Sequence, residues 1–270
     1  MLKIGTLGCG NMATAILKGV SAGMGAECAL FGYDLNMEKA EALRCIGLEP
    51  LHSVPAVLAA SDYVLLAVKP QNMDELLREI AESGNRDRVY LCIAAGVTAD
   101  RIKKTLGFDA RVVSIMPNTP LLLGAGATAM ARIPPVSDEE FAVARRIFSC
   151  AGTVREVPAD RMNEVISLNG STPAFLYEFA KGYIAYGVSQ GIDYETSLAL
   201  FCQTMRGAAE MMEHSGQDLD ALIRMVSSKG GTTIAGLDAL REKGLSEAVK
   251  ACCEACTARA YELAGMSGTK

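Results

Sequence analysis

The segment MLKIGTLGCGNMATAI, residues 1–16, decides the fold of this chain. The residues before its glycines are mostly apolar, as in a buried strand, and those after them carry apolar side chains at helical spacing. In a dinucleotide-binding unit, the first glycine makes the tight turn, the second admits a pyrophosphate to the backbone, and a third small residue packs helix on strand. Gly8, Gly10 and Ala13 fit these roles. We therefore expect a pyrophosphate on the amides that begin the helix; the alternative is a glycine-rich turn without a ligand.

An acidic residue is expected about 20 positions after such a glycine motif, where it can bond the ribose hydroxyls of the nucleotide. Asp34 stands there, after a predicted strand over 29–33 and before a predicted helix over about 36–46. A carboxylate at this place repels a 2′-phosphate and so favours NADH over NADPH. Two alternatives stay open: Asn36 and Lys39 are close enough in sequence to contact a phosphate, and Asp34 could be a plain capping residue.

Apolar strand patterns alternate with helical patterns as far as residue 116. Their nearly continuous apolar character is typical of a parallel sheet covered on both faces. The predicted fold class is therefore α/β, with an N-terminal doubly wound (Rossmann) dinucleotide-binding domain. Ligands in such sheets bind beyond the carboxyl ends of the strands. Three segments rich in small residues, prolines or polar side chains should then ring one crevice: 68–71, 94–97 and 116–120.

The glycine turn, the second strand and these strand ends together give the predicted cofactor-binding residues. They are Gly8, Cys9, Gly10, Asn11, Met12, Asp34, Asn36, Ala67, Val68, Lys69, Pro70, Ala94, Ala95 and Gly96.

Composition and charge restrict the class of protein. At about 100–200 residues per domain, the 270 residues suggest two domains, which we set at 1–158 for dinucleotide binding and 159–270 for an all-helical part. The net charge of −5 argues against a nucleic-acid partner. No apolar stretch reaches the ~20 residues of a membrane span, and the N-terminus enters a strand rather than a signal peptide. We expect a cytoplasmic protein with neither nucleic-acid nor membrane partners.

The second half of the chain shows helical spacing only, from about residue 160 onward. Two long helices, expected over 173–191 and 194–215, are apolar around much of their circumference. One small layer does not need so much apolar surface, so the helical part is predicted to form a homodimer or larger homo-oligomer.

The nine cysteines form no disulfide-like pattern and fit a reducing compartment. Cys253 and Cys256 have a metal-like C-x-x-C spacing, but no paired second cluster or histidine supplies further ligands. We expect buried cysteines on a helix, and no metal.

The segment SSKGGTTIAGLDALREKG, from Ser227, suggests a second anion site. Two glycines and two threonines lead into a helix predicted over 234–242. A helix start with free amides and close backbone access can hold a small carboxylate. The alternative is a well-capped helix with a glycine hinge before it.

Five blocks now carry a resemblance to a known family. AVKPQ at 67–71, AAGV at 94–97, MPNTP at 116–120, GSTPAF at 170–175 and SSKGGTTIAGL at 227–237 resemble the blocks of pyrroline-5-carboxylate reductases in order and spacing. The resemblance covers nearly the whole chain. It implies a two-domain oxidoreductase that reduces Δ1-pyrroline-5-carboxylate to L-proline with NADPH or NADH, as a dimer or larger assembly. NADPH is common in the family.

The resemblance also implies the substrate site. Thr233 would lie beside the imine nitrogen as the catalytic hydrogen-bond partner, and the substrate-binding residues would be Asn118, Ser228, Gly230, Gly231, Thr232 and Thr233. The chain departs from the family pattern at Asn169, Thr172, Phe175 and Lys229. Lys229 adds a positive charge beside the expected carboxylate site.

The chemistry of imine reduction agrees with the absence of a strong proton donor from the motifs of this chain. An imine nitrogen can be protonated before hydride transfer, so no strong proton donor is needed. The two histidines, His52 and His214, fall in no motif and are expected at the surface. Rival hypotheses are a related imine reductase, a β-hydroxyacid dehydrogenase with Lys181 as its lysine, and a non-enzymatic nucleotide sensor.

Overall fold

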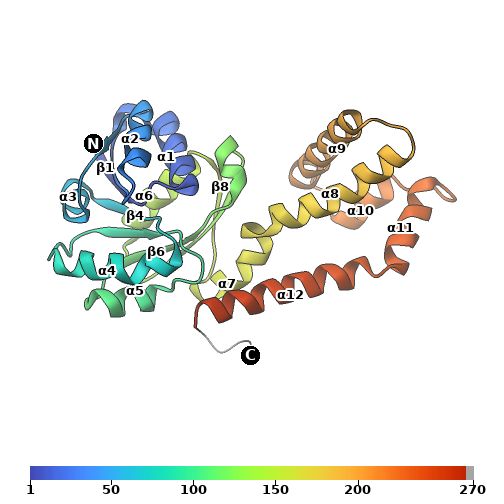
Figure 1. The fold of residues 1–270 in the computed structure, drawn as a ribbon. Coiled ribbons are helices and arrows are strands. Elements are labelled where there is room, and N and C mark those ends of the chain that lie inside the picture. The colour runs from blue at the N-terminus through green and yellow to red at the C-terminus, as the bar shows by residue number, and fades with distance from the viewer. Residues whose placement is uncertain (266–270) are drawn as a thin grey trace. The chain divides into compact units, whose positions relative to one another are not determined.

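A computed structural model describes residues 1–265 of the chain. The described chain divides into two compact units (Figure 1). The first comprises Met1–Pro173 and the chain from Ala255 onward, and the second comprises Ala174–Glu254. Within the described residues, no helix is both long and apolar enough to cross a membrane.

The first unit is built on one eight-stranded sheet in the order β3-β2-β1-β4-β5-β6-β7-β8. The strands β1 to β6 are parallel, as predicted, whereas β7 pairs antiparallel with β6 and parallel with β8. The parallel sheet predicted as far as residue 116 is confirmed, whereas β7 and β8 are strands that the sequence pattern did not predict. The strands are Leu2–Leu7 (β1), Cys28–Tyr33 (β2), Leu48–Pro50 (β3), Tyr63–Leu66 (β4), Val89–Cys92 (β5), Arg111–Met116 (β6), Gly126–Arg132 (β7) and Gly152–Glu156 (β8).

Twelve α-helices accompany these strands in the described chain. The first unit holds Asn11–Met24 (α1), Met37–Glu41 (α2), Val54–Ala60 (α3), Met73–Glu82 (α4), Ala99–Leu106 (α5), Asp138–Ser149 (α6) and Met162–Val165 (α7). The others are Thr172–Ser189 (α8), Tyr194–His214 (α9), Leu219–Met225 (α10), Thr232–Glu242 (α11) and Leu245–Leu263 (α12). The helix predicted over 234–242 begins two residues earlier than expected.

Six helices begin at a side chain that accepts a hydrogen bond from a first-turn amide. Such caps supply an acceptor to a helix amide that has no partner within the helix. Ser137 of α6 forms a full capping box with Glu140. The other capping residues are Asn36, Ser53, Thr98, Asp193 and Asp218.

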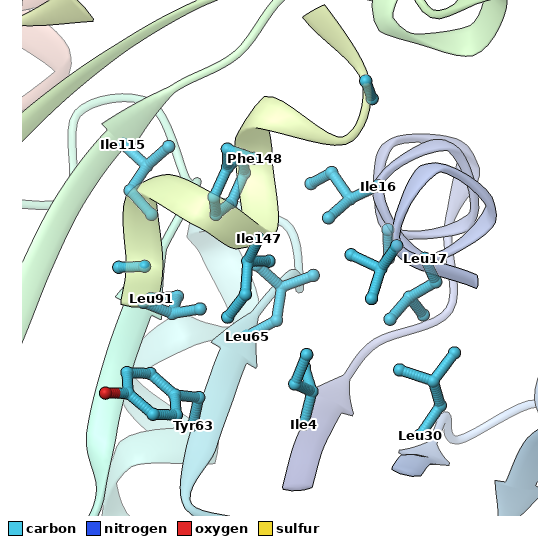
Figure 2. Packing of buried hydrophobic residues seen from close by; sticks show 14 of the residues in the cluster. Ile4, Ile16, Leu17, Leu30, Tyr63, Leu65, Leu91, Ile115, Ile147 and Phe148 are labelled. Atoms are coloured by element: carbon cyan, nitrogen blue, oxygen red, sulfur yellow. The ribbon is translucent and has the colours of Figure 1, made fainter. Parts of the chain in front are cut away.

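Two apolar cores cover the two faces of the sheet, because successive strand residues point to opposite faces. In β5, Leu91 belongs to one core, whereas Tyr90 and Cys92 belong to the other. Figure 2 shows the first core, where Leu65 and Leu91 from the sheet lie near side chains of α1 and α6. The helices α3, α4 and α5 cover the opposite face. This two-sided burial explains why the strand sequences are almost continuously apolar.

The second unit is helical and leaves much apolar surface exposed. The rings of Phe179 and Tyr183 on α8 pack against Phe201 on α9, with the Tyr183 and Phe201 centroids 5.0 Å apart. Further large apolar side chains on these helices are exposed: Leu176, Tyr177, Tyr186, Val188, Leu200, Met211 and Met212. So many exposed apolar side chains on two adjacent helices are typical of a protein–protein contact.

Candidate active site

The turn after β1 contains two glycines, and each position suits glycine for a different structural reason. Gly8 has a φ of +100°, and a Cβ there would lie 2.8 Å from the carbonyl carbon and oxygen of Ala67. Only glycine fits that position. Gly10 precedes α1 in an extended conformation, and no atom lies within 4 Å of where its Cβ would be. The space beside Gly10 is therefore open, as a ligand would require.

Asp34 is tied to this turn by hydrogen bonds. Its carboxylate accepts from the backbone amide of Cys9 at 2.8 Å and from that of Asn36 at 2.9 Å. The ammonium of Lys39 lies 3.9 Å away, and the Asp34 side chain is only 14% exposed. Because each carboxylate oxygen has a second lone pair, these contacts leave acceptor capacity for ribose hydroxyls.

Cys9, in the middle of the turn, is buried and chemically quiet. Burial is the main cause that raises the pKa of its thiol to about 12, and the negative charge of Asp34 raises it further. The neutral thiol is a poor nucleophile. Cys9 therefore supplies no sulfur chemistry, and its backbone amide is used by the Asp34 carboxylate.

A pocket of about 330 Å³ opens at the carboxyl ends of the central strands. Four predicted cofactor residues line it, and the rest of its wall comes from residues that sequence reasoning did not assign to the cofactor. The predicted ones are Met12, Ala67, Val68 and Ala95, and the others are Ile93, Met116, Pro117, Ile166, Gly170 and Ser171. Lys69 and Pro70 are exposed and do not line it, and Asn11 is exposed at the start of α1.

Ala94 and Gly96 line a different and larger cavity, of about 850 Å³. Met116 and Ile166 line both cavities and so lie between them. Gly96 has a φ of +73°, and a Cβ there would lie 3.3 Å from the backbone of Leu263. The close approach of the end of α12 therefore gives Gly96 a packing reason for its small size.

Asn118 is engaged by the backbone of the first unit. Its side-chain amide donates to the Asn169 carbonyl oxygen at 3.2 Å, and its side-chain oxygen accepts from the Ala127 amide at 2.9 Å. The Asn169 side chain in turn donates to the carbonyl oxygens of Met116 and Ala127. These bonds fix the segment after β6 against residues 166–170.

Residues Ile166–Gly170 form a π-helical turn between α7 and α8. The amide of Ser171 donates to the carbonyl oxygen of Ile166 at 2.8 Å, and the Thr172 hydroxyl donates to that of Ser167 at 2.7 Å. Single π turns inside helices are frequent at functional sites. Here the turn brings Ile166, Gly170 and Ser171 to the pocket wall.

The other predicted substrate residues lie in the second unit, around the start of α11. The Gly231 amide donates to the Ser228 carbonyl oxygen at 2.9 Å, and Gly230 has a φ of +72°. A Cβ on Gly231 would lie 2.5 Å from the Ser228 hydroxyl oxygen. Thr232 is exposed and Thr233 is half-buried. The segment is thus a tight glycine turn that leads directly into the helix.

The helices α1 and α11 share one feature at their N-termini. Both begin at a glycine, Gly10 and Gly231, and neither has a side chain that caps its amides. The first-turn amides and the helix dipole are therefore available to an anion, as they are in phosphate-binding helices. These are the two places where the sequence predicts a pyrophosphate and a carboxylate.

Other candidate groups lie away from these features. His52 and His214 are exposed, as predicted, and His214 pairs with Glu210 at 3.3 Å. Lys181 is exposed on α8 and forms an ion pair with Glu178 at 2.9 Å. Cys252, Cys253 and Cys256 lie on α12 and are half-buried rather than buried.

A doubly wound sheet with an open glycine turn, followed by helices, defines the class of two-domain dinucleotide-dependent oxidoreductases. The family described as "NADP oxidoreductase coenzyme F420-dependent" matches residues 3–96, and "Pyrroline-5-carboxylate reductase dimerisation" matches residues 159–263. The pyrroline-5-carboxylate reductase of Escherichia coli K12 is 35% identical over 92% of this chain and 93% of its own. The chain belongs to the pyrroline-5-carboxylate reductase family.

Solved structures of such reductases have the same fold. That of Coxiella burnetii superposes with a TM-score of 0.89 at 30% identity, and covers 98% of both chains. That of Plasmodium falciparum, which has NADP bound, superposes with a TM-score of 0.87 at 25% identity, over 97% of this chain and 98% of its own.

Proposed function

We propose that this chain reduces Δ1-pyrroline-5-carboxylate to L-proline, with NAD(P)H as the hydride donor, in the last step of proline biosynthesis. The observation that carries the proposal is the match to the reductase family along nearly the whole chain. The two matched regions include both anion-ready helix starts, Gly10 in the first and Gly231 in the second.

For the cofactor, the proposed site is the glycine turn with the neighbouring strand ends. The pyrophosphate would lie on the amides at Gly10, Asn11 and Met12, where the space is open. The pocket of Ala67, Val68 and Ala95 suits a flat apolar ring in size and character. The half-buried carboxylate of Asp34 favours NADH, and the adjacent Lys39 is the group best placed to accept a 2′-phosphate if Asp34 is removed.

For the substrate, the proposed anchor is the start of α11. The uncapped amides at Thr232 and Thr233 would bind the carboxylate. Ser228, Gly230 and Gly231 would shape the turn, since the Gly231 amide already donates to the Ser228 carbonyl oxygen. The Thr233 hydroxyl would bond the imine nitrogen. We assign Asn118 a positioning role, because both ends of its amide already bind backbone groups.

The reaction requires little from the protein except the correct positioning of the imine against the cofactor. The dinucleotide, when bound, supplies a hydride to the carbon of the C=N bond. An imine nitrogen can be protonated before that transfer, so a half-buried hydroxyl that orients the nitrogen is sufficient and no strong acid is required.

The proposed domain organisation separates cofactor binding from substrate binding and assembly. Residues 1–158 bind the dinucleotide, and residues 159–270 bind the substrate and form a homodimer or a larger homo-oligomer. The exposed apolar side chains of α8 and α9 support that assembly. The nine cysteines are all free, as is typical of the cytoplasm, where we place the reaction.

The test is an assay of substrate choice. The purified chain should oxidise NADH or NADPH in the presence of Δ1-pyrroline-5-carboxylate and should leave small β-hydroxyacids with NAD(P) unchanged. Turnover of a β-hydroxyacid instead, or of a different cyclic imine in preference, would replace the proposal with one of its rivals. Cofactor binding without any turnover would favour a nucleotide sensor. The exposed, ion-paired Lys181 does not favour the β-hydroxyacid reading.

A further inference from the structure

Ser171 stands out in the pocket at the strand ends. Among the ten residues that line this pocket in the described chain, it alone carries a polar side chain. Ligand pockets are mostly apolar, and a few placed polar groups fix the orientation of what binds there. One hydroxyl in such a wall is therefore the natural orienting group.

Ser171 is held in place from two directions. Its amide closes the π-helical turn by donating to the Ile166 carbonyl oxygen at 2.8 Å. Its hydroxyl oxygen accepts a hydrogen bond from the thiol of Cys256 on α12, with the sulfur and oxygen 3.4 Å apart. Both Ser171 and Cys256 belong to the first unit. The hydroxyl is thus fixed by a residue that does not itself line the pocket.

The direction of this contact matters. A serine hydroxyl has one proton to donate and two lone pairs to accept with. Because the thiol of Cys256 donates to the Ser171 oxygen, the hydroxyl proton is not used in this contact and can be donated elsewhere. The other side chains of the pocket wall are apolar and offer this proton no acceptor, whereas a bound molecule with a polar group can accept it.

We propose that Ser171 donates a hydrogen bond to the carboxamide oxygen of the nicotinamide ring, and that Cys256 is a positioning residue for its hydroxyl. This inference rests on the proposed function, which puts a nicotinamide in this pocket. The ring itself suits the apolar wall, whereas its carboxamide is polar and is costly to bury without a partner. A bond to the carboxamide fixes the rotation of the ring and hence the direction in which its reactive carbon points. Orientation of this kind contributes directly to the rate of transfer.

Calorimetry with two ligands tests the assignment without relying on turnover. NADH carries the nicotinamide, and ADP-ribose lacks it but keeps the pyrophosphate and both riboses. Ser171→Ala should weaken NADH binding by about fivefold to tenfold, the effect of one hydrogen bond. It should leave ADP-ribose binding unchanged within about twofold, since that ligand makes no use of the hydroxyl. Equal losses for both ligands, or no loss for either, would overturn the proposal.

Cys256 is tested by a graded set of variants. Cys256→Ala frees the hydroxyl to rotate and should weaken NADH binding by about twofold to threefold, because a thiol is a weak donor. Cys256→Ser restores a donor and should recover the wild-type affinity. The matched control is Cys253→Ala, one turn earlier on α12, which should change nothing. A loss in Cys256→Ala that Cys256→Ser does not recover would exclude the positioning role.

Thionicotinamide adenine dinucleotide identifies the accepting atom, because sulfur replaces the carboxamide oxygen and is a weaker acceptor. The loss caused by Ser171→Ala should shrink to about twofold or less in its reduced form. An undiminished loss would show that Ser171 bonds another part of the ligand. A wild-type chain that binds NADH but fails to reduce Δ1-pyrroline-5-carboxylate would contradict the proposed function, and the calorimetric comparison would still decide the role of Ser171. Thermal melting of each variant confirms that it is folded.

Discussion

The backbone amide of Cys9 donates a hydrogen bond to the carboxylate of Asp34 across 2.8 Å. This bond ties the end of β2 to the middle of the turn between β1 and α1. Asp34 therefore has two parts to play in the proposed site: it shapes the turn, and it presents a negative charge near the expected position of the adenine ribose. The ammonium of Lys39, 3.9 Å from the same carboxylate, partly balances that charge.

Cofactor preference should depend on this pair of charges. We expect the wild type to prefer NADH, and Asp34→Ser to raise the ratio of kcat/KM with NADPH to that with NADH by about tenfold or more. The estimate corresponds to ~1 to 3 kcal/mol for a charge-assisted hydrogen bond. In the double variant Asp34→Ser, Lys39→Ala, most of the gain should disappear, because Lys39 is no longer available to a 2′-phosphate. A wild-type preference for NADPH would contradict this prediction and leave the reductase function intact.

The two glycines of the turn should respond differently to substitution. Gly10→Val should fold normally, since the space around Gly10 is open, but should lose most of its affinity for NADH, because the branched side chain enters the space of the pyrophosphate. Gly8→Ala should instead lower the free energy of unfolding by about 1 to 3 kcal/mol, because its φ of +100° is strained for any other residue. Calorimetry and thermal melting on both variants separate the effects. Unchanged affinity in a folded Gly10→Val would remove the pyrophosphate from this turn.

Catalysis should depend on the side-chain hydroxyl of Thr233, but only on the backbone amide of Thr232. Thr233→Ala should keep its fold and its affinity for the cofactor, and kcat/KM for the imine should fall by about tenfold to a hundredfold, as expected for one hydrogen bond of ~1.5 to 3 kcal/mol to a charged group. Thr233→Ser should recover most of the activity. Thr232→Ala, one residue earlier on the same helix, is the matched control and should remain close to wild type. Full activity in Thr233→Ala would move the role to Ser228 or to an ordered water.

The buried thiols should be unreactive in the folded protein. Burial raises the pKa of Cys92 to about 11, and that of Cys9 to about 12, so both stay neutral at pH 8. A disulfide reagent at pH 8 should therefore label the exposed Cys45 quickly and reach Cys9 and Cys92 only after denaturation. Peptide mapping by mass spectrometry identifies the labelled sites. Rapid labelling of Cys9 in the native chain would mean that the turn opens readily.

The exposed apolar face of α8 should hold the assembly together. Tyr186 is 68% exposed in the described chain. Tyr186→Asp puts a charge on this face and should convert the oligomer to monomers at micromolar concentration, because a buried unpaired carboxylate is costly. Tyr186→Phe keeps the ring and should not change the assembly. Light scattering measures the molar mass of the wild type and of both variants. A monomeric wild type would contradict the prediction.

Local sequence pattern predicted the first six strands well, for a physical reason. A buried parallel strand must be apolar on both faces, and the glycine turn allows few alternatives, so residues 1–116 carry strong local signals. The antiparallel β7 was missed because its direction depends on how the chain returns from β6. Only nine residues, 117–125, separate the two strands. A parallel crossover needs a dozen or more residues, so the short connection was the signal that could have found it.

Predicted cofactor residues reach the pocket from the ends of strands, as Ala67, Val68 and Ala95 do, and from the start of α1, as Met12 does. Ile166, Gly170 and Ser171 reach the same pocket from a helical segment some fifty residues farther along the chain than Met116. No local pattern marks a π-helical turn, so this contribution depends on tertiary packing. The family resemblance assigns Asn118 to the substrate site, and in the structure both ends of its side-chain amide bind backbone groups.

The π-helical turn at Ile166–Gly170 also constrains how this chain can change in evolution. A π turn accommodates one residue more than the α-helix around it, so a single-residue deletion there is the change that would restore regular helix. Such a deletion would close the wide turn across which the Ser171 amide reaches the Ile166 carbonyl oxygen, and would remove one of the residues that form this part of the pocket wall. The side chains of the turn are constrained as well, since Asn169 binds the backbone of Met116 and Ala127. The insertion and deletion record of descendants should therefore be empty at these five positions.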